Sequence, residues 1–297
     1  MASLYVSDLD FTLLRSDATL GARTVDVVNL LIATGHHFTC ATARSYKSAV
    51  RVTAGLRLTL PLITYGGAVR FDPTRGSIDN VEPLPAETVD AITAVTGAHP
   101  RVEPLLFAMV DGRDRVCWRE NHATDYVDSF TSRRANDPRL LPLPDWGQLV
   151  DAPVFYATLI GERDDIDGLR RELLPVLTDC FDTVGPDGYN PRQTWFEIMS
   201  TRATKAAAAR GLADQIGADQ LIAFGDNLND VPLFEVADRG CAVANAVANA
   251  VPQLLHIADE VVPGNDDEGV ASWLERHVLE TDRPSYALSD PWVCQPD

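Results

Sequence analysis

The sequence predicts an α/β protein, with a doubly wound (Rossmann-like) parallel-sheet core and an inserted α+β cap domain. Short apolar runs alternate with longer amphipathic runs at the start of the chain, and the same rhythm resumes near its end. Such an alternation of strand and helix is typical of a parallel sheet with helices on its faces. Between these segments the sequence is richer in proline and charge, which indicates a separate domain.

The two outer segments supply the elements of the expected core. Residues 4–6, 38–40 and 60–64 are predicted strands, and residues 24–33 and 45–54 are the helices between them. Late in the chain an alanine-rich helix over 204–216 precedes a buried strand at 221–224. A further helix and strand follow, and they end at Val243. The two segments therefore look like halves of one domain.

The middle of the chain predicts an insertion. Apolar runs at 107–110, 115–118 and 154–160 read as strands that Asp/Gly turns separate. We expect a discontinuous core of residues 1–81 and 190–282, and an inserted α+β cap domain of residues 82–189. Residues 283–297 hold three prolines and no periodic pattern, so they are expected to form a loose C-terminal tail.

Charge and cysteine usage restrict the class of protein. The formal net charge of -18 argues against nucleic acid or an anionic membrane as the main partner, because the field of the protein would repel both. The five cysteines are scattered without a Cys-x-x-Cys pair, which predicts neither disulfides nor a thiolate metal site. No basic leader and no membrane-length apolar run is present. A cytoplasmic location is therefore expected.

The first candidate motif is Asp8-Leu9-Asp10-Phe11-Thr12, directly after the first strand, and it contains the pair Asp8 and Asp10. Two carboxylates at alternate positions can point to the same side, and ligands of open α/β sheets bind at the carboxyl ends of the strands. A turn with solvated aspartates is the alternative.

The second motif is Thr42, Ala43 and Arg44, which follows the next strand and is expected to open a helix. A hydroxyl and free backbone N–H groups at a helix start suit phosphate oxygens, although threonine is also an ordinary helix cap.

The third motif is Lys205, near the start of the helix over 204–216. A cation there opposes the helix dipole unless an anion is bound, which favours an anion site. A snorkelling surface lysine is the equal alternative.

The fourth motif runs from Gly225 to Asp230 and contains Asp226, Asn227 and Asn229 after a buried strand. Oxygen-rich side chains crowded into a turn can hold a hard cation such as Mg²⁺, and this is the most specific of the four signals. A later acidic run, residues 266–268, is read as an exposed loop.

All four motifs stand at strand ends or helix starts, so a parallel sheet would bring them to one edge. Their order along the chain and their amino-acid sequences resemble those of the haloacid dehalogenase-like phosphatases of the Cof-type (type IIB cap) branch. Tyr65-Gly66-Gly67-Ala68, where the branch usually has an Asn-Gly-Ala turn, and the loop of residues 265–271 extend the resemblance. Ala43 stands where the family commonly has Gly, which is tolerable if only its N–H is used. Gly66 replaces an Asn that helps to orient substrate.

The resemblance implies roles for single residues. Asp8 would be the nucleophile, and Asp10 the general acid that then activates water. Mg²⁺ would be held by Asp8, by the backbone carbonyl of Asp10 and by Asp226, while Asp230 orients these groups or pairs with Lys205. The remaining role is to bind the phosphoryl group, and the residues implied for it are Thr42, Ala43, Arg44, Lys205 and Asn229.

The implied activity is that of a Mg²⁺-dependent phosphatase acting on a small phosphomonoester through an aspartyl-phosphate. A sugar phosphate is the favoured substrate, and the cap supplies plausible contacts at Arg113, Trp118, Arg119 and Tyr156. A phosphosugar mutase of the same branch and a non-catalytic phosphometabolite-binding protein are the alternatives. The expected partner is a small phosphorylated metabolite, and the sequence leaves open whether the chain is a monomer or a homodimer.

Overall fold

The computed structural model describes residues 2–186, 190, 192–245 and 251–280, and the expected tail of residues 283–297 lies outside them. The described chain forms two compact units. The first unit takes the described residues within Met1–Cys40, Arg51–Thr59 and Gly217–Asp297, and the second takes those within Ala41–Val50 and Leu60–Ile216. No helix within the described ranges is both long and apolar enough to cross a membrane.

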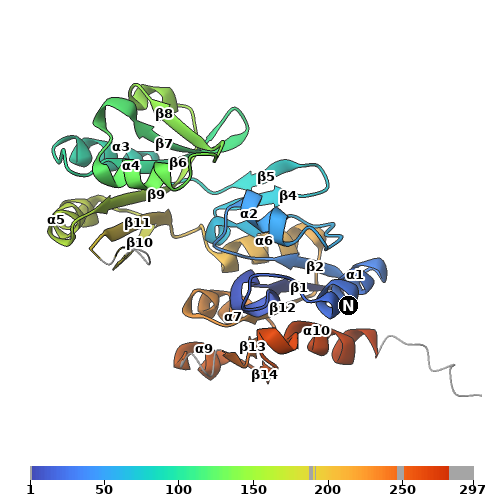
Figure 1. The fold of residues 1–297 in the computed structure, drawn as a ribbon. Coiled ribbons are helices and arrows are strands. Elements are labelled where there is room, and N and C mark those ends of the chain that lie inside the picture. The colour runs from blue at the N-terminus through green and yellow to red at the C-terminus, as the bar shows by residue number, and fades with distance from the viewer. Residues whose placement is uncertain (1, 187–189, 191, 246–250, 281–297) are drawn as a thin grey trace, which may run out of the picture. The chain divides into compact units, whose positions relative to one another are not determined.

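The first unit is built on a five-stranded parallel sheet in the order β14-β13-β12-β1-β2 (Figure 1). Its strands are β1 (Ser3–Ser7), β2 (His37–Cys40), β12 (Gln220–Gly225), β13 (Arg239–Val243) and β14 (Glu260–Val262). Its helices are α1 (Ala22–Ala33), α7 (Val231–Val236), α9 (Pro252–Ile257) and α10 (Gly269–Leu274). The strands expected near residues 4–6, 38–40 and 221–224 are confirmed.

Helices cover both faces of this sheet. Trp273 of α10 packs its ring against Tyr5 of β1 and Phe224 of β12, which lie on one face. A Cβ on Gly240 of β13 would meet the ring of Phe234 of α7, and Gly240 pairs with Ala223, whose side chain points to the other face. The doubly wound arrangement predicted from the sequence is confirmed.

The strand register sets where the first and fourth motifs lie. β1 and β12 are neighbours, and Ser7 pairs with Phe224 near the ends of both strands. The backbone N–H of Asp8 donates to the carbonyl of Phe224 at 2.9 Å. Asp8 and Asp226 therefore leave the carboxyl ends of adjacent parallel strands, at the sheet edge where open α/β sheets bind ligands.

The second unit contains a six-stranded sheet in the order β10-β11-β9-β6-β7-β8, antiparallel except for β7 and β8. Its strands are β6 (Pro104–Val110), β7 (Arg113–Arg119), β8 (Leu140–Leu143), β9 (Val154–Gly161), β10 (Cys180–Pro186) and β11 (Thr194–Ser200). Its helices are α3 (Ala86–Gly97), α4 (Asp125–Ser132), α5 (Arg163–Leu173) and α6 (Lys205–Ile216).

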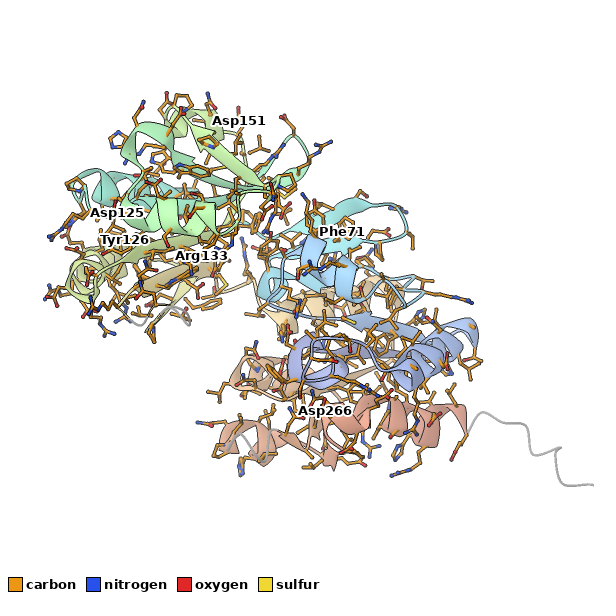
Figure 2. The ribbon with its side chains drawn as sticks, viewed as in Figure 1. Phe71, Asp125, Tyr126, Arg133, Asp151 and Asp266 are labelled. Carbon is orange, nitrogen blue, oxygen red and sulfur yellow. The ribbon has the colours of Figure 1, made fainter. Side chains whose placement is uncertain are left out.

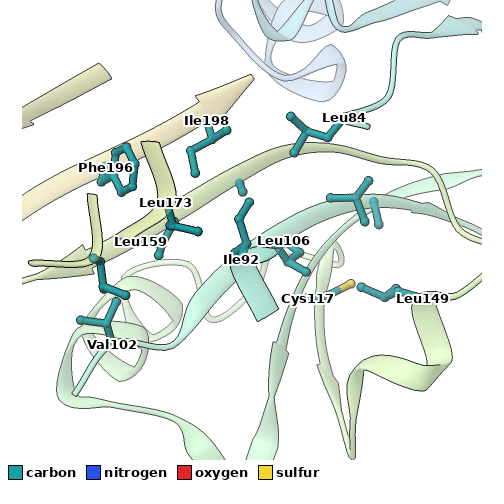
Figure 3. Packing of buried hydrophobic residues seen from close by; sticks show 14 of the residues in the cluster. Leu84, Ile92, Val102, Leu106, Cys117, Leu149, Leu159, Leu173, Phe196 and Ile198 are labelled. Carbon is teal, nitrogen blue, oxygen red and sulfur yellow. The ribbon is translucent and has the colours of Figure 1, made fainter. Parts of the chain in front are cut away.

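Side chains on the two faces of this sheet enter different apolar clusters. Leu106 of β6 packs with Ile92 of α3 and Leu173 of α5, the cluster drawn in Figure 3. The alternate residue Phe107 packs on the opposite face with Phe130 of α4. This alternation is the period of two that a strand between two apolar layers requires.

The expected strand at residues 60–64 forms, but not as a third member of the parallel sheet. β3 (Leu62–Thr64) pairs antiparallel with β4 (Val69–Asp72), which pairs with β5 (Ser77–Val81). Its parallel pairing is limited to one bridge between Ala41 and Ile63. A three-residue strand does not indicate from its sequence which strand it will pair with. The hairpin that follows β3 therefore decides the pairing.

Candidate active site

Three of the predicted site residues meet in the first unit. Carboxylate oxygens of Asp8, Asp226 and Asp230 all lie within 4.8 Å of one another, and all three residues are buried. Carboxylates so close together repel one another where water cannot screen them. Their convergence therefore indicates a site for a cation.

A turn after β1 positions Asp8 and Asp10. Leu9–Leu13 forms a single helical turn in which the Leu13 N–H donates to the Asp8 carbonyl at 3.3 Å. Asp8 is 6% exposed, whereas Asp10 is half-buried and is not one of the three clustered carboxylates. The two motif aspartates thus have different surroundings, which suits different roles.

The fourth motif folds around the Asp230 carboxylate. One of its oxygens accepts the backbone N–H groups of Asp226 at 3.1 Å and Asn227 at 3.2 Å. A Cβ on Gly225 would lie 2.6 Å from the Asp230 carboxyl carbon, so only glycine leaves room for this arrangement. Asp230 therefore holds the turn in shape as well as contributing charge.

Sequence reasoning missed the role of Thr12, which lies within the first motif. Its hydroxyl donates to the Asp226 carboxylate at 2.9 Å, and Thr12 is 1% exposed. This bond joins the loop after β1 to the loop after β12. A small hydroxyl residue in a carboxylate motif was the available signal.

The donor set of this cluster fits a hard divalent cation. Carboxylate oxygens are the ligands that Mg²⁺ prefers, and a cation offsets the repulsion among Asp8, Asp226 and Asp230. Burial, helped by the charge of Asp8, also raises the pKa of the Cys40 thiol, which therefore stays protonated and adds no further charge.

The two amides of the fourth motif differ in what they do. Asn227 caps the 3₁₀ turn Leu228–Asp230, and its side-chain oxygen accepts the Leu228 N–H at 2.7 Å. Asn229 is exposed. Asn227 therefore shapes the loop, while the side chain of Asn229 faces outward.

The second motif lies in the second unit as a loop rather than a helix start. The helix expected at 45–54 is α2 (Tyr46–Val52), so Thr42 precedes its first turn and the expectation that this motif opens a helix is wrong. Instead the Thr42 hydroxyl accepts the Arg44 N–H at 3.1 Å, and Arg44 donates to the Ser48 hydroxyl at 3.0 Å. Ala43 is exposed.

The third motif is buried. Lys205 is the first residue of α6 and is 3% exposed, so the interpretation as a snorkelling surface lysine is wrong. Thr204 caps the helix by accepting the Ala207 N–H at 3.0 Å. A buried ammonium in the first helical turn is unfavourable to the helix dipole and needs negative charge nearby.

A glycine turn joins the second and third motifs within the second unit. Gly66 donates its N–H to the Thr42 carbonyl at 2.9 Å, and Tyr65 donates its N–H to the Arg44 carbonyl at 2.9 Å. On the other side, a Cβ on Gly67 would lie 2.2 Å from the carbonyl oxygen of Thr204. The turn Tyr65–Gly67 thus packs against both the loop of residues 42–44 and the start of α6.

A buried polar cluster, which the sequence did not reveal, surrounds the Tyr65 hydroxyl. It donates to the Asp114 carboxylate and accepts from Arg139 at 2.8 Å, across 49 and 74 residues of sequence. Burial, followed by the charge of Asp114, raises the pKa of Tyr65 well above its ordinary value. The second oxygen of Asp114 is buried and has no hydrogen-bond partner in the described structure.

Two residues that were expected to contact substrate from the cap instead bind other side chains of the second unit. Arg119 is paired with Glu103 at 2.7 Å, and the Tyr156 hydroxyl donates to Glu197. Both side chains hold the six-stranded sheet together. Arg113 is exposed and Trp118 is half-buried.

The loop of residues 265–268 is more than an exposed acidic segment. Asn265 is buried and donates its side-chain amide to the Leu14 carbonyl at 3.0 Å, and Glu268 accepts from Arg15 at 2.5 Å. Asp266, labelled in Figure 2, is exposed and accepts from the Ser16 hydroxyl at 2.6 Å. The expectation of an exposed loop holds for Asp266 and Asp267 and is wrong for Glu268, whose contacts brace the segment after Asp8.

Comparison with known proteins covers almost the whole chain. A family model described as haloacid dehalogenase-like hydrolase matches residues 5–274. The 5-amino-6-(5-phospho-D-ribitylamino)uracil phosphatase YitU of Bacillus subtilis is 24% identical over 283 residues, which are 92% of this chain and 97% of that protein. Phosphatase YwpJ of the same organism is 37% identical over 86 residues, 28% of each chain.

Solved structures share the fold. A protein from Thermotoga maritima superposes with a TM-score of 0.72 at 23% identity, over 93% of this chain and 97% of that chain. A haloacid dehalogenase-like hydrolase from Bacteroides thetaiotaomicron gives a TM-score of 0.71 at 21% identity, over 93% of this chain and 99% of that chain.

Proposed function

We propose that this chain, which belongs to the haloacid dehalogenase-like hydrolases, is a Mg²⁺-dependent phosphatase that hydrolyses a small phosphomonoester through an aspartyl-phosphate on Asp8. The observation that carries the proposal is the cluster of three buried carboxylates, with oxygens within 4.8 Å, at the carboxyl ends of β1 and β12. A buried concentration of negative charge serves no purpose in packing. It suits a site that gathers a cation to accept an anionic substrate.

Asp8 and Asp10 divide the chemistry between them in this proposal. The Asp8 carboxylate attacks phosphorus and the bond to the leaving-group oxygen breaks, which replaces one difficult step by two easier ones. Asp10 gives its proton to that oxygen and then takes one from the water that hydrolyses the aspartyl-phosphate. The half-buried position of Asp10, outside the three-carboxylate cluster, supports this division because a proton carrier needs access to solvent.

The cation would be held by the side chains of Asp8, Asp226 and Asp230 and by the backbone carbonyl of Asp10. When bound, it neutralises charge on the phosphoryl group. Three hydrogen bonds keep its ligands in place: Thr12 donates to Asp226, and the Asp226 and Asn227 N–H groups both donate to Asp230.

We assign the binding of the phosphoryl oxygens to Thr42, Ala43, Arg44, Lys205 and Asn229. The type of basic residue at position 205 supports this role. Of the 25 lysines and arginines in this chain, only residues 47 and 205 are lysine, and all the others are arginine. A buried lysine is a compact point charge that suits a phosphoryl group. Its proposed catalytic part is to stabilise charge that develops on that group.

The division into a core of residues 1–81 and 190–282 and a cap of residues 82–189 is also a proposal, supported by the change from parallel to antiparallel sheet. The substrate is proposed to be a small phosphorylated metabolite, with a sugar phosphate favoured. The printed name of YitU adds a ribitylaminouracil phosphate to the compounds to test. A cytoplasmic location rests on the cysteine pattern, and a monomer or homodimer is expected.

The test is release of inorganic phosphate from a panel of phosphomonoesters, with and without Mg²⁺, by wild-type protein and the Asp8→Asn variant. Asp26→Asn is the matched control, because it makes the same change at an exposed position on α1. We expect release that requires both Mg²⁺ and Asp8 and that Asp26→Asn leaves intact. Isomerised product without free phosphate would indicate a mutase, and binding without any turnover would indicate a non-catalytic protein.

A further inference from the structure

Phe11 has a backbone conformation that its side chain does not favour. Its φ is 57° and its ψ is 12°, in the left-handed region that glycine adopts freely and bulky residues avoid. The conformation is held by hydrogen bonds to main-chain carbonyls, because the Asn245 side-chain amide donates to the Phe11 carbonyl at 2.7 Å and Leu14 donates its N–H to the Leu9 carbonyl at 2.8 Å. A glycine at position 11 could accept the same hydrogen bond without the strain.

Packing does not explain why a phenylalanine stands there. The side chain is 53% exposed, and it is the one aromatic among the exposed large hydrophobic residues of the described chain. Non-glycine residues held in strained conformations cluster at functional sites, where the side chain has a use that offsets the strain. An exposed aromatic ring on a strained residue therefore points to a ligand contact.

The position of Phe11 indicates which part of a ligand it meets. It directly follows Asp10, the proposed general acid, whose carboxyl group must reach the oxygen of the leaving group. A second exposed apolar side chain, Leu228, is 54% exposed on the loop after β12. The hydrogen bond from Thr12 to Asp226 ties these two loops together, so both exposed apolar side chains lie on loops that also carry carboxylates of the cluster.

We infer that Phe11, with Leu228, is a specificity-determining contact for the leaving group, and that the substrate is a phosphomonoester whose leaving group presents the face of a ring. An aromatic side chain offers a large apolar surface with few rotatable bonds, and it gains most from a ring that can lie against it. An acyclic leaving group, such as glycerol, presents no such face. This inference rests on the proposed function, because it takes Asp10 as the acid that protonates the leaving group.

The test compares kcat/KM for glucose 6-phosphate with that for glycerol 3-phosphate in four proteins: wild type, Phe11→Gly, Phe11→Tyr and Leu30→Ala. We expect Phe11→Gly to lower the ratio of the two values about threefold to tenfold, the size of an aromatic contact. Phe11→Tyr keeps the ring and should keep the ratio. Leu30 is 52% exposed on α1, so Leu30→Ala controls for the loss of an exposed apolar side chain.

Thermal unfolding separates a contact with substrate from a structural role. Glycine relieves the strain at position 11 but gives the unfolded chain more freedom, so the Tm of Phe11→Gly should stay within about 3 °C of wild type. A larger fall in Tm would overturn the inference. An unchanged ratio of the two kcat/KM values would overturn it as well, whether both values stay the same or both fall equally. An equal fall is also the result expected if Phe11 packs against another part of this chain.

The outcome remains interpretable if the proposed function fails. Should the wild-type protein release no phosphate from any ester, calorimetry would measure binding of the same two esters to wild type and Phe11→Gly in the presence of Mg²⁺. A selective loss of affinity for glucose 6-phosphate would support the contact. Equal affinities in the two proteins would overturn it.

Discussion

Gly225 decides whether the Asp230 carboxylate can sit beneath the loop that follows β12. A Cβ at position 225 would lie 2.6 Å from the Asp230 carboxyl carbon, at a site where that carboxylate also accepts two backbone N–H groups. We therefore expect Gly225→Ala to destabilise the protein by about 1–3 kcal/mol, as overpacking does. The substitution should also raise the Mg²⁺ concentration that phosphate release requires. Urea unfolding and a Mg²⁺ titration of activity measure the two effects.

Gly211 provides the matched control for that substitution. It lies within α6, and a Cβ there would meet nothing within 4 Å. Gly211→Ala should stabilise the protein by about 0.5–1 kcal/mol, because glycine is unfavourable inside a helix. Equal effects of the two substitutions would contradict the role given to Gly225.

Thr12 is the second residue on which the carboxylate cluster depends, through the hydrogen bond that its hydroxyl donates. Thr12→Val keeps the shape of the side chain but removes the hydrogen bond to Asp226, so a loss of about 1.5–3 kcal/mol in the free energy of unfolding is expected. Thr12→Ser keeps the donor and should lose less. If valine and serine gave the same stability and the same activity, the hydroxyl would not be what holds Asp226.

The Tyr65–Gly67 turn is the element that connects the two motifs of the second unit for which we propose phosphate binding. Gly67 has a φ of 119° and touches the Thr204 backbone, so Gly67→Ala should displace the start of α6 and raise KM. Gly66 has a φ of 67°, and a Cβ there would meet nothing within 4 Å. Asparagine tolerates this left-handed conformation, so Gly66→Asn should fold with an unchanged Tm.

Thermal unfolding and KM measurements on these two variants test the role of the turn. The pair is informative because adjacent glycines are changed and only one of them contacts Thr204. A large fall in Tm for Gly66→Asn, or a KM for Gly67→Ala equal to that of wild type, would show that the turn does not position α6.

The elements also show where prediction from sequence succeeds and where it stops. β1 and β12 were predictable because each is a buried apolar run that ends in acidic residues, and their parallel pairing brings Asp8 and Asp226 together. The start of α2 at Tyr46 lies one residue from the predicted start, but the position of Thr42 in a loop before the helix was not predictable, because Thr42 bonds its own loop in the manner of a helix cap. Local chemistry of this kind looks the same in a turn and at a helix start.

Burial and long-range partners are what the sequence could not supply. Lysine at a helix start is compatible with a surface or a buried position, and only packing of the second unit decides that Lys205 is buried. The cluster of Tyr65, Asp114 and Arg139 joins residues far apart in sequence, and none of them belongs to a motif that suggests the others. No pattern within a short window can reveal such contacts.

For the whole molecule, one buried tyrosine and two half-buried ones predict how stability depends on pH. Burial is the largest cause of a raised pKa in all three. It raises the pKa values of Tyr65 and Tyr156 well above the ordinary tyrosine value, and it raises the pKa of Tyr46 to about 12. A raised pKa means that the folded state holds the proton more tightly than the unfolded chain. This contribution to stability is therefore complete below about pH 10, the unfolded value, and is lost as pH rises through the folded values.

Urea unfolding between about pH 8 and pH 11 measures this dependence. Each tyrosine that keeps its proton in the folded state adds up to about 1.4 kcal/mol of lost stability per pH unit above its unfolded pKa. Tyr65→Phe removes one such group, so its stability should fall less steeply with pH than that of wild type. Identical slopes would mean that Tyr65 does not stay protonated in the folded protein.

The most direct test of the central claim is to trap a phosphoryl group on Asp8. Asp10→Asn should form the aspartyl-phosphate from p-nitrophenyl phosphate, whose leaving group needs no proton, but should hydrolyse it slowly because water is no longer activated. After an acid quench, mass spectrometry should find one phosphoryl group on the peptide that contains Asp8, and none in the Asp8→Asn variant. Turnover of this ester by Asp8→Asn at the wild-type rate, without a phosphorylated peptide, would contradict the account.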